Sequence, residues 1–162
     1  MKLEERAVSQ GDSMAFDLVI RNGTVATAVD IWQGDIGVAE GRVSALGRRL
    51  APGNREIDAA GKLVLPGGVD SHCHIAQRTS QGLVTADDFE SGTISAAFGG
   101  TTTIIPFAAQ HRGQSLRAVV DDYHRHADNK AIVDYAFHVI VSDPSEQVLK
   151  DALEELVQAG HM

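Results

Sequence analysis

The sequence has almost no cysteine and no long apolar run, and each shortage excludes a class of protein. The single cysteine, Cys73, cannot form an internal disulfide, which is typical of a reducing compartment and predicts a cytoplasmic location. No apolar run approaches the ~20 residues needed to cross a bilayer. The N-terminal residues have mixed charge and lack the apolar centre of a signal peptide. We therefore expect neither a membrane segment nor a secretory leader.

Basic residues are also in short supply. Lys and Arg number 14 against 22 Asp and Glu, which gives a net charge of −8. An acidic chain without a basic run is a poor binder of nucleic acid or anionic membranes. No glycine-rich phosphate-binding motif follows a predicted strand, so a nucleotide-binding fold is not indicated. What is present, 43% hydrophobic and 22% charged residues in a chain of 162, is the composition of a globular protein.

The first part of the chain predicts a tail followed by a β-rich region. Residues 1–15 are polar and have no period, so we interpret them as a tail. Residues 16–65 alternate short β-forming runs with turn signals, which predicts a small β meander or sandwich-like subdomain, here incomplete. Within it, Asn22-Gly23 predicts one hairpin and Glu40-Gly41 predicts a second.

Residues 66–162 alternate strand and helix patterns joined by short loops. We predict strands at 69–75, 101–106 and 131–141. We predict three helices, the first capped within residues 85–88 and the last within residues 143–146. The middle helix has Leu116, Val119, Val120 and Tyr123 on one face, and the last has Val148, Leu149, Ala152, Leu153, Leu156 and Val157. Such alternation predicts a parallel sheet, either an open doubly wound α/β sheet or the first part of a (β/α)8 barrel.

The segment that joins these regions carries the strongest functional signal. Residues 64–75 read Val-Leu-Pro-Gly-Gly-Val-Asp-Ser-His-Cys-His-Ile. In a strand His72 and His74 converge on one face while Cys73 points away. Two convergent imidazoles at a strand end predict a metal site, and the alternative is a pair of solvated polar residues. Asp70 shares their face, either as an acceptor that orients a ligand or as a packing residue.

These residues resemble a known family. The stretch from Leu65 to His74 is similar to the Pro-Gly-x-x-Asp-x-His-x-His signature of the amidohydrolase superfamily. Further stretches resemble the N-terminal portion of its dihydropyrimidinases and hydantoinases: Phe16–Val25, Ile57–Lys62, Asp88–Thr93, Gly99–Ile105 and Asp134–Val141. The resemblance implies that residues 66–162 form the first three β/α units of an incomplete TIM-type (β/α)8 metal-dependent hydrolase barrel.

The resemblance also implies a chemistry. Family members hydrolyse the ring C–N amide bond of dihydropyrimidines, hydantoins or related cyclic imides through a metal-bound hydroxide. Two divalent metal ions, usually zinc, are bridged by a carboxylated lysine, and an aspartate moves the proton. His72 and His74 match the pair that binds one of the two ions. A small cyclic amide or imide is the implied partner, and the complete protein is expected to form a homotetramer or another homo-oligomer.

Only part of the implied site has a counterpart here. The family's lysine and catalytic aspartate lie on later strands, and neither Lys130 nor Lys150 matches the lysine, so no residue is assigned as catalytic. We expect the chain alone to bind metal weakly, to be inactive and to aggregate. Pro106 stands where many relatives carry Asp. Ala76 stands where dihydroorotases carry an Arg, which argues against that branch.

Several other residues and two other functions remain open. The loop from Gln77 to Val84 is a candidate for shaping substrate entry, and Gln77 and His111 are candidates for contacting a ligand or substrate. His138 is interpreted as a hydrogen-bonded core residue. The alternative functions are a non-catalytic dihydropyrimidinase-like scaffold protein, a truncated product without activity, or an open α/β binding module.

Overall fold

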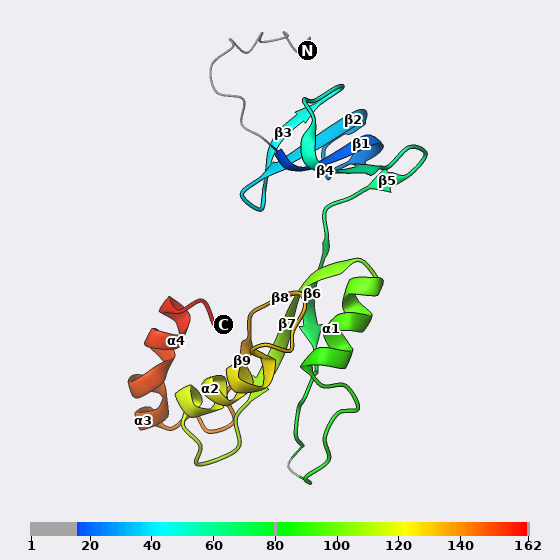
Figure 1. Ribbon diagram of the computed structural model, residues 1–162. Coiled ribbons are helices and arrows are strands. Elements are labelled where there is room, and N and C mark those ends of the chain that lie inside the picture. Colours follow the sequence, from blue (N-terminus) through cyan, green and yellow to red (C-terminus); the bar gives the residue numbers. More distant parts are fainter. Residues whose placement is uncertain (1–15, 80, 162) are drawn as a thin grey trace. The chain divides into compact units, whose positions relative to one another are not determined.

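The computed structural model describes residues 16–79 and 81–161, so the predicted tail at 1–15 lies outside the described residues. The chain divides into two compact units, one through Pro66 and the other from Gly67 (Figure 1). Within the described ranges, no helix is both long and apolar enough to cross a membrane.

The first unit is a five-stranded sheet with strand order β3-β2-β1-β4 and β5 beside β1. β2 is antiparallel to β1 and β3, whereas β4 and β5 run parallel to β1. The unit is therefore not a simple meander, because two of its strands return in the direction of the first. The strands are β1 (Phe16–Ala26), β2 (Ile31–Ala39), β3 (Arg42–Gly47), β4 (Gly53–Asp58) and β5 (Leu63–Val64).

The hairpin predicted at Asn22-Gly23 is wrong. β1 continues through this dipeptide, and its register with β2 shifts between Ile20 and Gly23, as in a β-bulge. Asn22 has a φ of 60°, which asparagine tolerates better than most residues. Its backbone N–H donates to Asp35 at 3.0 Å and its side chain donates to Asp58 at 3.0 Å. These bonds to β2 and β4 hold the dipeptide inside the strand.

The second predicted hairpin is confirmed. Glu40 and Gly41 connect β2 to β3 with φ values of 52° and 70°, and Ala39 pairs with Arg42 across them. Two successive residues with positive φ form the turn that matches the twist of an antiparallel pair.

The second unit is a parallel sheet with helices, as predicted. β6 and β8 pair with β7 in parallel, and β9 pairs with the later part of β7. The strands are β6 (Gly68–Cys73), β7 (Thr101–Ala109), β8 (Asp134–Tyr135) and β9 (His138–Ile140). The helices are α1 (Phe89–Phe98), α2 (Leu116–Ala127), α3 (Glu146–Val148), the π-helical turn η1 (Leu149–Leu153) and α4 (Glu154–Gln158).

The third predicted strand, residues 131–141, is instead broken into β8 and β9. β8 pairs with β7 up to Ile104, and β9 resumes the pairing at Phe107. Between these positions lies Pro106, which has no amide N–H to donate to the sheet. The interruption of the strand therefore coincides with the one β7 residue that cannot complete a ladder.

The predicted helices form, but two of their caps are displaced. Asp88, rather than Thr85, caps α1, because Asp88 and Ser91 exchange backbone-to-side-chain bonds of 2.8 and 3.2 Å. Ser145, rather than Asp143, caps α3. Asp143 instead accepts a bond from the backbone of Gly113 at 3.0 Å.

One core joins the sheet of the second unit to its helices. The predicted apolar face of α2 is confirmed, since all four of its residues are buried. The predicted face of the last helix is only partly buried: Ala152 and Leu156 are covered, whereas Val157 is 56% exposed. The buried core residues are Ile75, Phe89, Ile104, Ala108, Leu116, Val119, Val120, Tyr123, Ala127, Phe137, Ala152 and Leu156.

Candidate metal-binding site

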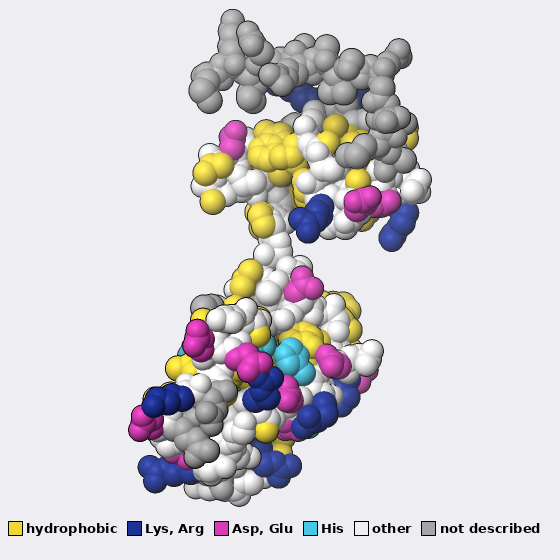
Figure 2. Space-filling view, turned by 90° about the vertical axis from the view of Figure 1, so that its left-hand side faces the viewer, with side chains coloured by type: hydrophobic (Ala, Val, Ile, Leu, Met, Phe, Trp, Pro, Cys, Tyr) yellow, Lys and Arg dark blue, Asp and Glu magenta, His cyan; other side chains and the backbone are white. Residues whose placement is uncertain are grey.

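The two histidines of the H-x-H pair lie side by side where β6 ends. His72 is in β6, His74 follows its last residue, and their ring centroids are 5.5 Å apart. Both are exposed, whereas Cys73 between them is half-buried against the core. This is the alternation that a strand imposes. Histidine side chains reach the surface of this unit beside acidic and hydrophobic ones (Figure 2).

A phenylalanine from the neighbouring strand holds three histidines together. The ring centroid of Phe107 in β7 lies 4.7 Å from that of His72, 5.1 Å from that of His74 and 5.1 Å from that of His138. We call His72, His74 and His138 the histidine cluster. The sequence predicts His138 to be a hydrogen-bonded core residue. It does make the expected hydrogen bond, to the carbonyl of Ser71 at 3.1 Å, but it is only half-buried and contacts Phe107.

Sequence reasoning did not include Phe107 or His138 in the site. A signal for both existed in the pairing of parallel strands, because Phe107 and His138 are register partners on β7 and β9. The carboxyl ends of parallel strands meet at one edge of a sheet, so residues there are candidates for a common site. The register itself could not be read from the sequence, since the break at Pro106 shifts where β9 begins.

Two residues near the pair make the hydrogen bonds that position its backbone and rings. The side-chain oxygen of Gln77 accepts a hydrogen bond at Nδ1 of His74. Asp70 accepts a bond from the backbone N–H of His72 at 3.0 Å, and so contacts the main chain of a candidate ligand rather than its imidazole.

Cys73 is a packing residue in this arrangement. Burial raises the pKa of its thiol to about 11, and the charge of Asp70 adds a smaller increase. A hydrogen bond with the backbone of Ile105 lowers the pKa and partly offsets these effects. A thiol with such a pKa is almost entirely protonated at neutral pH, and it is the thiolate that acts as a nucleophile or a metal ligand. The chemistry of this segment therefore rests on its histidines.

The spacing of the two imidazoles fits a shared metal ion. Two imidazoles on one tetrahedral zinc ion have ring centroids ~5 Å apart, because each Zn–N bond is about 2.0–2.1 Å. The centroids of His72 and His74, 5.5 Å apart, meet this requirement with little movement. Among residues 16–79 and 81–161 there is no group of three or more His, Cys, Asp or Glu placed to hold a metal ion. The described residues thus supply a pair of ligands rather than a complete set.

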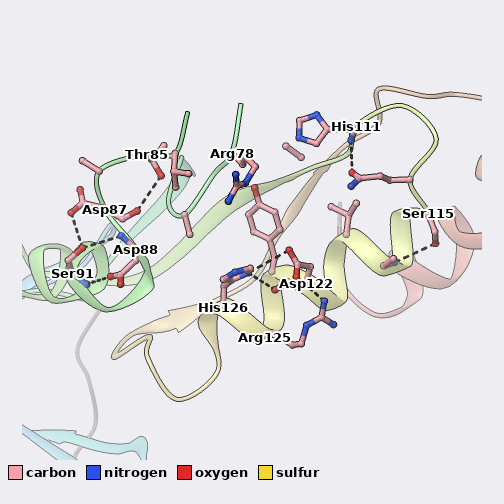
Figure 3. A pocket seen from close by; sticks show the side chains of 18 residues that line it. Arg78, Thr85, Asp87, Asp88, Ser91, His111, Ser115, Asp122, Arg125 and His126 are labelled. Carbon is pink, nitrogen blue, oxygen red and sulfur yellow. Dashed lines mark hydrogen bonds and ion pairs between the residues drawn. The ribbon is translucent and has the colours of Figure 1, made fainter. Parts of the chain in front are cut away.

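His111 lies apart from the pair. It lines a cavity of about 850 Å³ between the loop that precedes α1 and the side of α2, and neither His72 nor His74 lines it. In Figure 3 the carboxylate of Asp122 reaches toward Arg125 and His126 at one wall of this cavity. The structure therefore brings Gln77 to the histidine pair but does not bring His111 there.

Comparison with known proteins identifies the family. No family model matches the chain. The chain is 43% identical over 143 residues to a D-hydantoinase of Geobacillus stearothermophilus, covering 88% of this chain and 30% of that protein. It is 43% identical over 147 residues to a dihydropyrimidinase of Rattus norvegicus, covering 87% of this chain and 28% of that protein. A solved structure of a D-hydantoinase matches with a TM-score of 0.84 at 41% identity, covering 90% of this chain and 31% of that one.

These likenesses define the chain as a mixed α/β member of the cyclic amidohydrolases. It belongs to their hydantoinase and dihydropyrimidinase family and corresponds to the N-terminal portion of its members. The resemblance predicted from the sequence is confirmed at this level. The chain spans about 30% of the length of the relatives it matches.

Proposed function

We propose that this chain carries the first metal-binding part of an enzyme that hydrolyses the ring C–N amide bond of dihydropyrimidines, hydantoins or related cyclic imides. The observation that carries the proposal is the H-x-H pair. His72 and His74 lie on one face at the end of β6 with ring centroids 5.5 Å apart, in a chain of the hydantoinase and dihydropyrimidinase family. In the same proposal, residues 66–162 are part of a (β/α)8 barrel and residues 16–65 part of a β-rich subdomain.

His72 and His74 would hold a divalent metal ion, for which zinc is the first candidate because imidazole nitrogen suits it. When bound in such a site, the ion lowers the pKa of a water molecule and polarises a carbonyl group. The chain's own residues orient the ligands. Phe107 contacts both rings, Gln77 accepts at His74, and Asp70 fixes the backbone of His72.

Two ligands alone support a weaker site than three or four. We therefore propose that the 162-residue chain by itself binds zinc weakly and does not hydrolyse cyclic amides. Hydrolysis would require the remaining ligands and the proton-transferring group that the family resemblance implies. The enzyme is proposed to work in the cytoplasm as a homo-oligomer, in keeping with the single cysteine and the family resemblance.

Zinc binding tests the proposed site directly. We expect the chain to bind one zinc ion weakly, as measured by equilibrium dialysis, and His72→Ala and His74→Ala each to abolish that binding. His126→Ala is the matched control, because His126 is an exposed histidine on α2. Zinc binding that survives both substitutions contradicts the site. Hydrolysis of hydantoin or dihydrouracil by the wild-type chain contradicts the proposed need for further residues.

A further inference from the structure

We propose that Gln77 is a positioning residue that selects which nitrogen of His74 faces the metal. This inference rests on the proposed function, because it concerns the same site. Nothing in the H-x-H motif specifies which of its ring nitrogens coordinates. The choice depends on what the other nitrogen bonds, and in this chain that partner comes from the loop that follows β6.

The contact between the two side chains decides the tautomer of His74. The Gln77 side-chain oxygen lies at Nδ1 of His74. An amide oxygen can only accept a hydrogen bond, so Nδ1 must carry the hydrogen. In a neutral imidazole the other nitrogen, Nε2, then has the lone pair that a metal ion needs. Gln77 thus presents His74 as an Nε2 ligand.

The backbone between the two residues is bent in a way that makes this contact possible. Ala76 has a φ of 52°, a left-handed conformation that is unfavourable for a residue with a β-carbon. Glycine would adopt it without this cost, yet alanine is present. The bend turns the chain sharply after Ile75 and brings the side chain of Gln77 back to His74, three residues earlier.

The loop that carries Gln77 is fastened at several points. The Gln77 N–H donates to the hydroxyl of Thr85 at 3.0 Å, and the Thr85 N–H donates to the Gln77 carbonyl at 3.0 Å. The Ala76 N–H donates to the Asp87 carbonyl at 2.9 Å, directly before the cap of α1. Gln77 is therefore held by its backbone, which leaves its side chain to bond His74.

The face of the His74 ring is held by a different element. Phe107 stacks on it with an interplanar angle of 16° and a centroid distance of 5.1 Å. With Phe107 on its face and Gln77 at its Nδ1 edge, the imidazole can turn over only by breaking the stacking on the way and ending without its bond to Gln77. Outer hydrogen-bond partners of metal-bound histidines typically contribute 10–100-fold to metal affinity.

The experiment compares the tautomer and the zinc affinity in the whole 162-residue chain. Long-range ¹H–¹⁵N spectra of the imidazoles, recorded without metal, should show His74 protonated at Nδ1. In Gln77→Leu we expect the Nδ1-protonated population to fall and zinc affinity to drop about 10–100-fold. Gln77→Glu keeps an acceptor in place and should restore both. Gln81→Leu removes an exposed glutamine from the same loop and should change neither.

The outcomes separate this inference from the proposed function. If zinc binds and depends on His72, but Gln77→Leu leaves both the affinity and the His74 tautomer as in wild type, the role of Gln77 is overturned alone. If the spectra show His74 protonated at Nε2 in the wild-type chain, the inference is wrong whatever the metal does. If zinc does not bind the chain at all, the proposed site fails, and the metal-free spectra still decide whether Gln77 sets the tautomer.

Discussion

In each unit of the chain, polar side chains from neighbouring strands form a cluster. The two clusters differ in how many of their polar groups have hydrogen-bond or ion-pair partners. In the first unit Arg21 of β1 donates to Asp35 of β2 at 2.8 Å and to Glu56 of β4 at 2.5 Å. In the histidine cluster of the second unit, by contrast, the exposed ring of His72 has no hydrogen-bond partner among the described residues.

The charged side chains of the cluster in the first unit, Arg21, Asp35 and Glu56, are paired with one another. Burial alone would raise the pKa of Asp35, but bonds from the backbone N–H groups of Asn22 and Leu50 and from Arg21 lower it below its usual range. The bonds to Glu56 and Asp35 raise the pKa of the Arg21 guanidinium in turn. Every group in this cluster already has partners, so it stabilises the sheet and has little left to offer a ligand.

The contrast teaches how to separate a structural polar cluster from a binding site. Both clusters contain residue types that occur in active sites, and both come from adjacent strands. Only the histidine cluster leaves nitrogen atoms exposed at the end of a parallel strand, where ligands bind in α/β proteins. The two units also carry separate optical reporters, because the only tryptophan is Trp32 and the only tyrosines are Tyr123 and Tyr135. Each prediction can therefore be assigned to its unit.

The largest effect is expected in the core of the second unit. Phe137 is 1% exposed and packs against Phe89, Tyr123 and Tyr135. Phe137→Ala should lower the free energy of unfolding of this unit by about 3–5 kcal/mol, since it removes a buried ring and leaves a cavity. Denaturant unfolding followed by tyrosine absorbance measures it. Phe98→Ala, at a residue 91% exposed, is the matched control and should have almost no effect.

The second largest effect on stability is expected in the charged cluster of the first unit, which contains Arg21, Asp35 and Glu56. Asp35 is 3% exposed, and Asp35→Ala would leave the N–H groups of Asn22 and Leu50 without their acceptor. We expect a loss of about 3 kcal/mol in the unfolding of the first unit, measured by Trp32 fluorescence. Glu40→Gln removes an exposed charge from the same unit and should leave the transition unchanged. Equal effects of the two substitutions would show that Asp35 is not a structural centre.

The sequence predicted the second unit better than the first, for a physical reason. The apolar period of α2 and the β-branched run of β7 extend over many residues, and a capping pattern and the alternation of a strand indicated α1 and β6, so these elements could be anticipated. The Asn22-Gly23 signal was misleading because the acceptors that keep it within a strand, Asp35 and Asp58, are distant in sequence. Long-range bonds of this kind have no local signature.

In the candidate metal-binding site, too, local features were predicted from the sequence and long-range contacts were not. The face shared by His72 and His74 follows from the alternation of a strand and was predicted. The contact of Gln77 with His74 depends on the left-handed conformation of Ala76. An alanine in the sequence does not predict this conformation. Phe107 and His138 depend on the strand register. What the sequence concealed in both units is tertiary pairing, not local structure.

The pH dependence of stability should also differ between the units. Burial and the nearby His124 lower the pKa of His161, whose ring lies 5.4 Å from that of His124 and stacks on Phe137. Around this pair, His124 contacts the hydroxyl of Tyr135, which donates to Asp128 at 2.6 Å. A histidine with a lowered folded-state pKa takes up its proton more readily when unfolded. Its contribution to stability is therefore present above about pH 6.5 and lost as the pH falls below that value.

The contribution of the Asp35 carboxyl has the same sign of pH dependence as that of His161, but it changes in a lower pH range. Its folded-state pKa is lowered, so its contribution is present above about pH 4 and is lost only on further acidification. Between pH 7 and 5 we expect the tyrosine-detected transition to weaken while the Trp32-detected one holds. His161→Phe should reduce this pH dependence, and His126→Phe, at an exposed position on α2, should not. If the Trp32-detected transition weakens at a higher pH than the tyrosine-detected one, the predicted difference in pH dependence between the two units is wrong.

The smallest effect is expected at the turn between β2 and β3, and it raises stability. Glu40 has a φ of 52° in a turn whose second residue is Gly41, and asparagine is favoured over glutamate at such a position. Glu40→Asn should therefore raise the free energy of unfolding of the first unit by about 0.5–1 kcal/mol, measured by Trp32 fluorescence, and leave the tyrosine-detected transition unchanged. Glu40→Val, which puts a β-branched residue at the same φ, should lower it. If both substitutions act alike, the left-handed turn does not govern the stability of this hairpin.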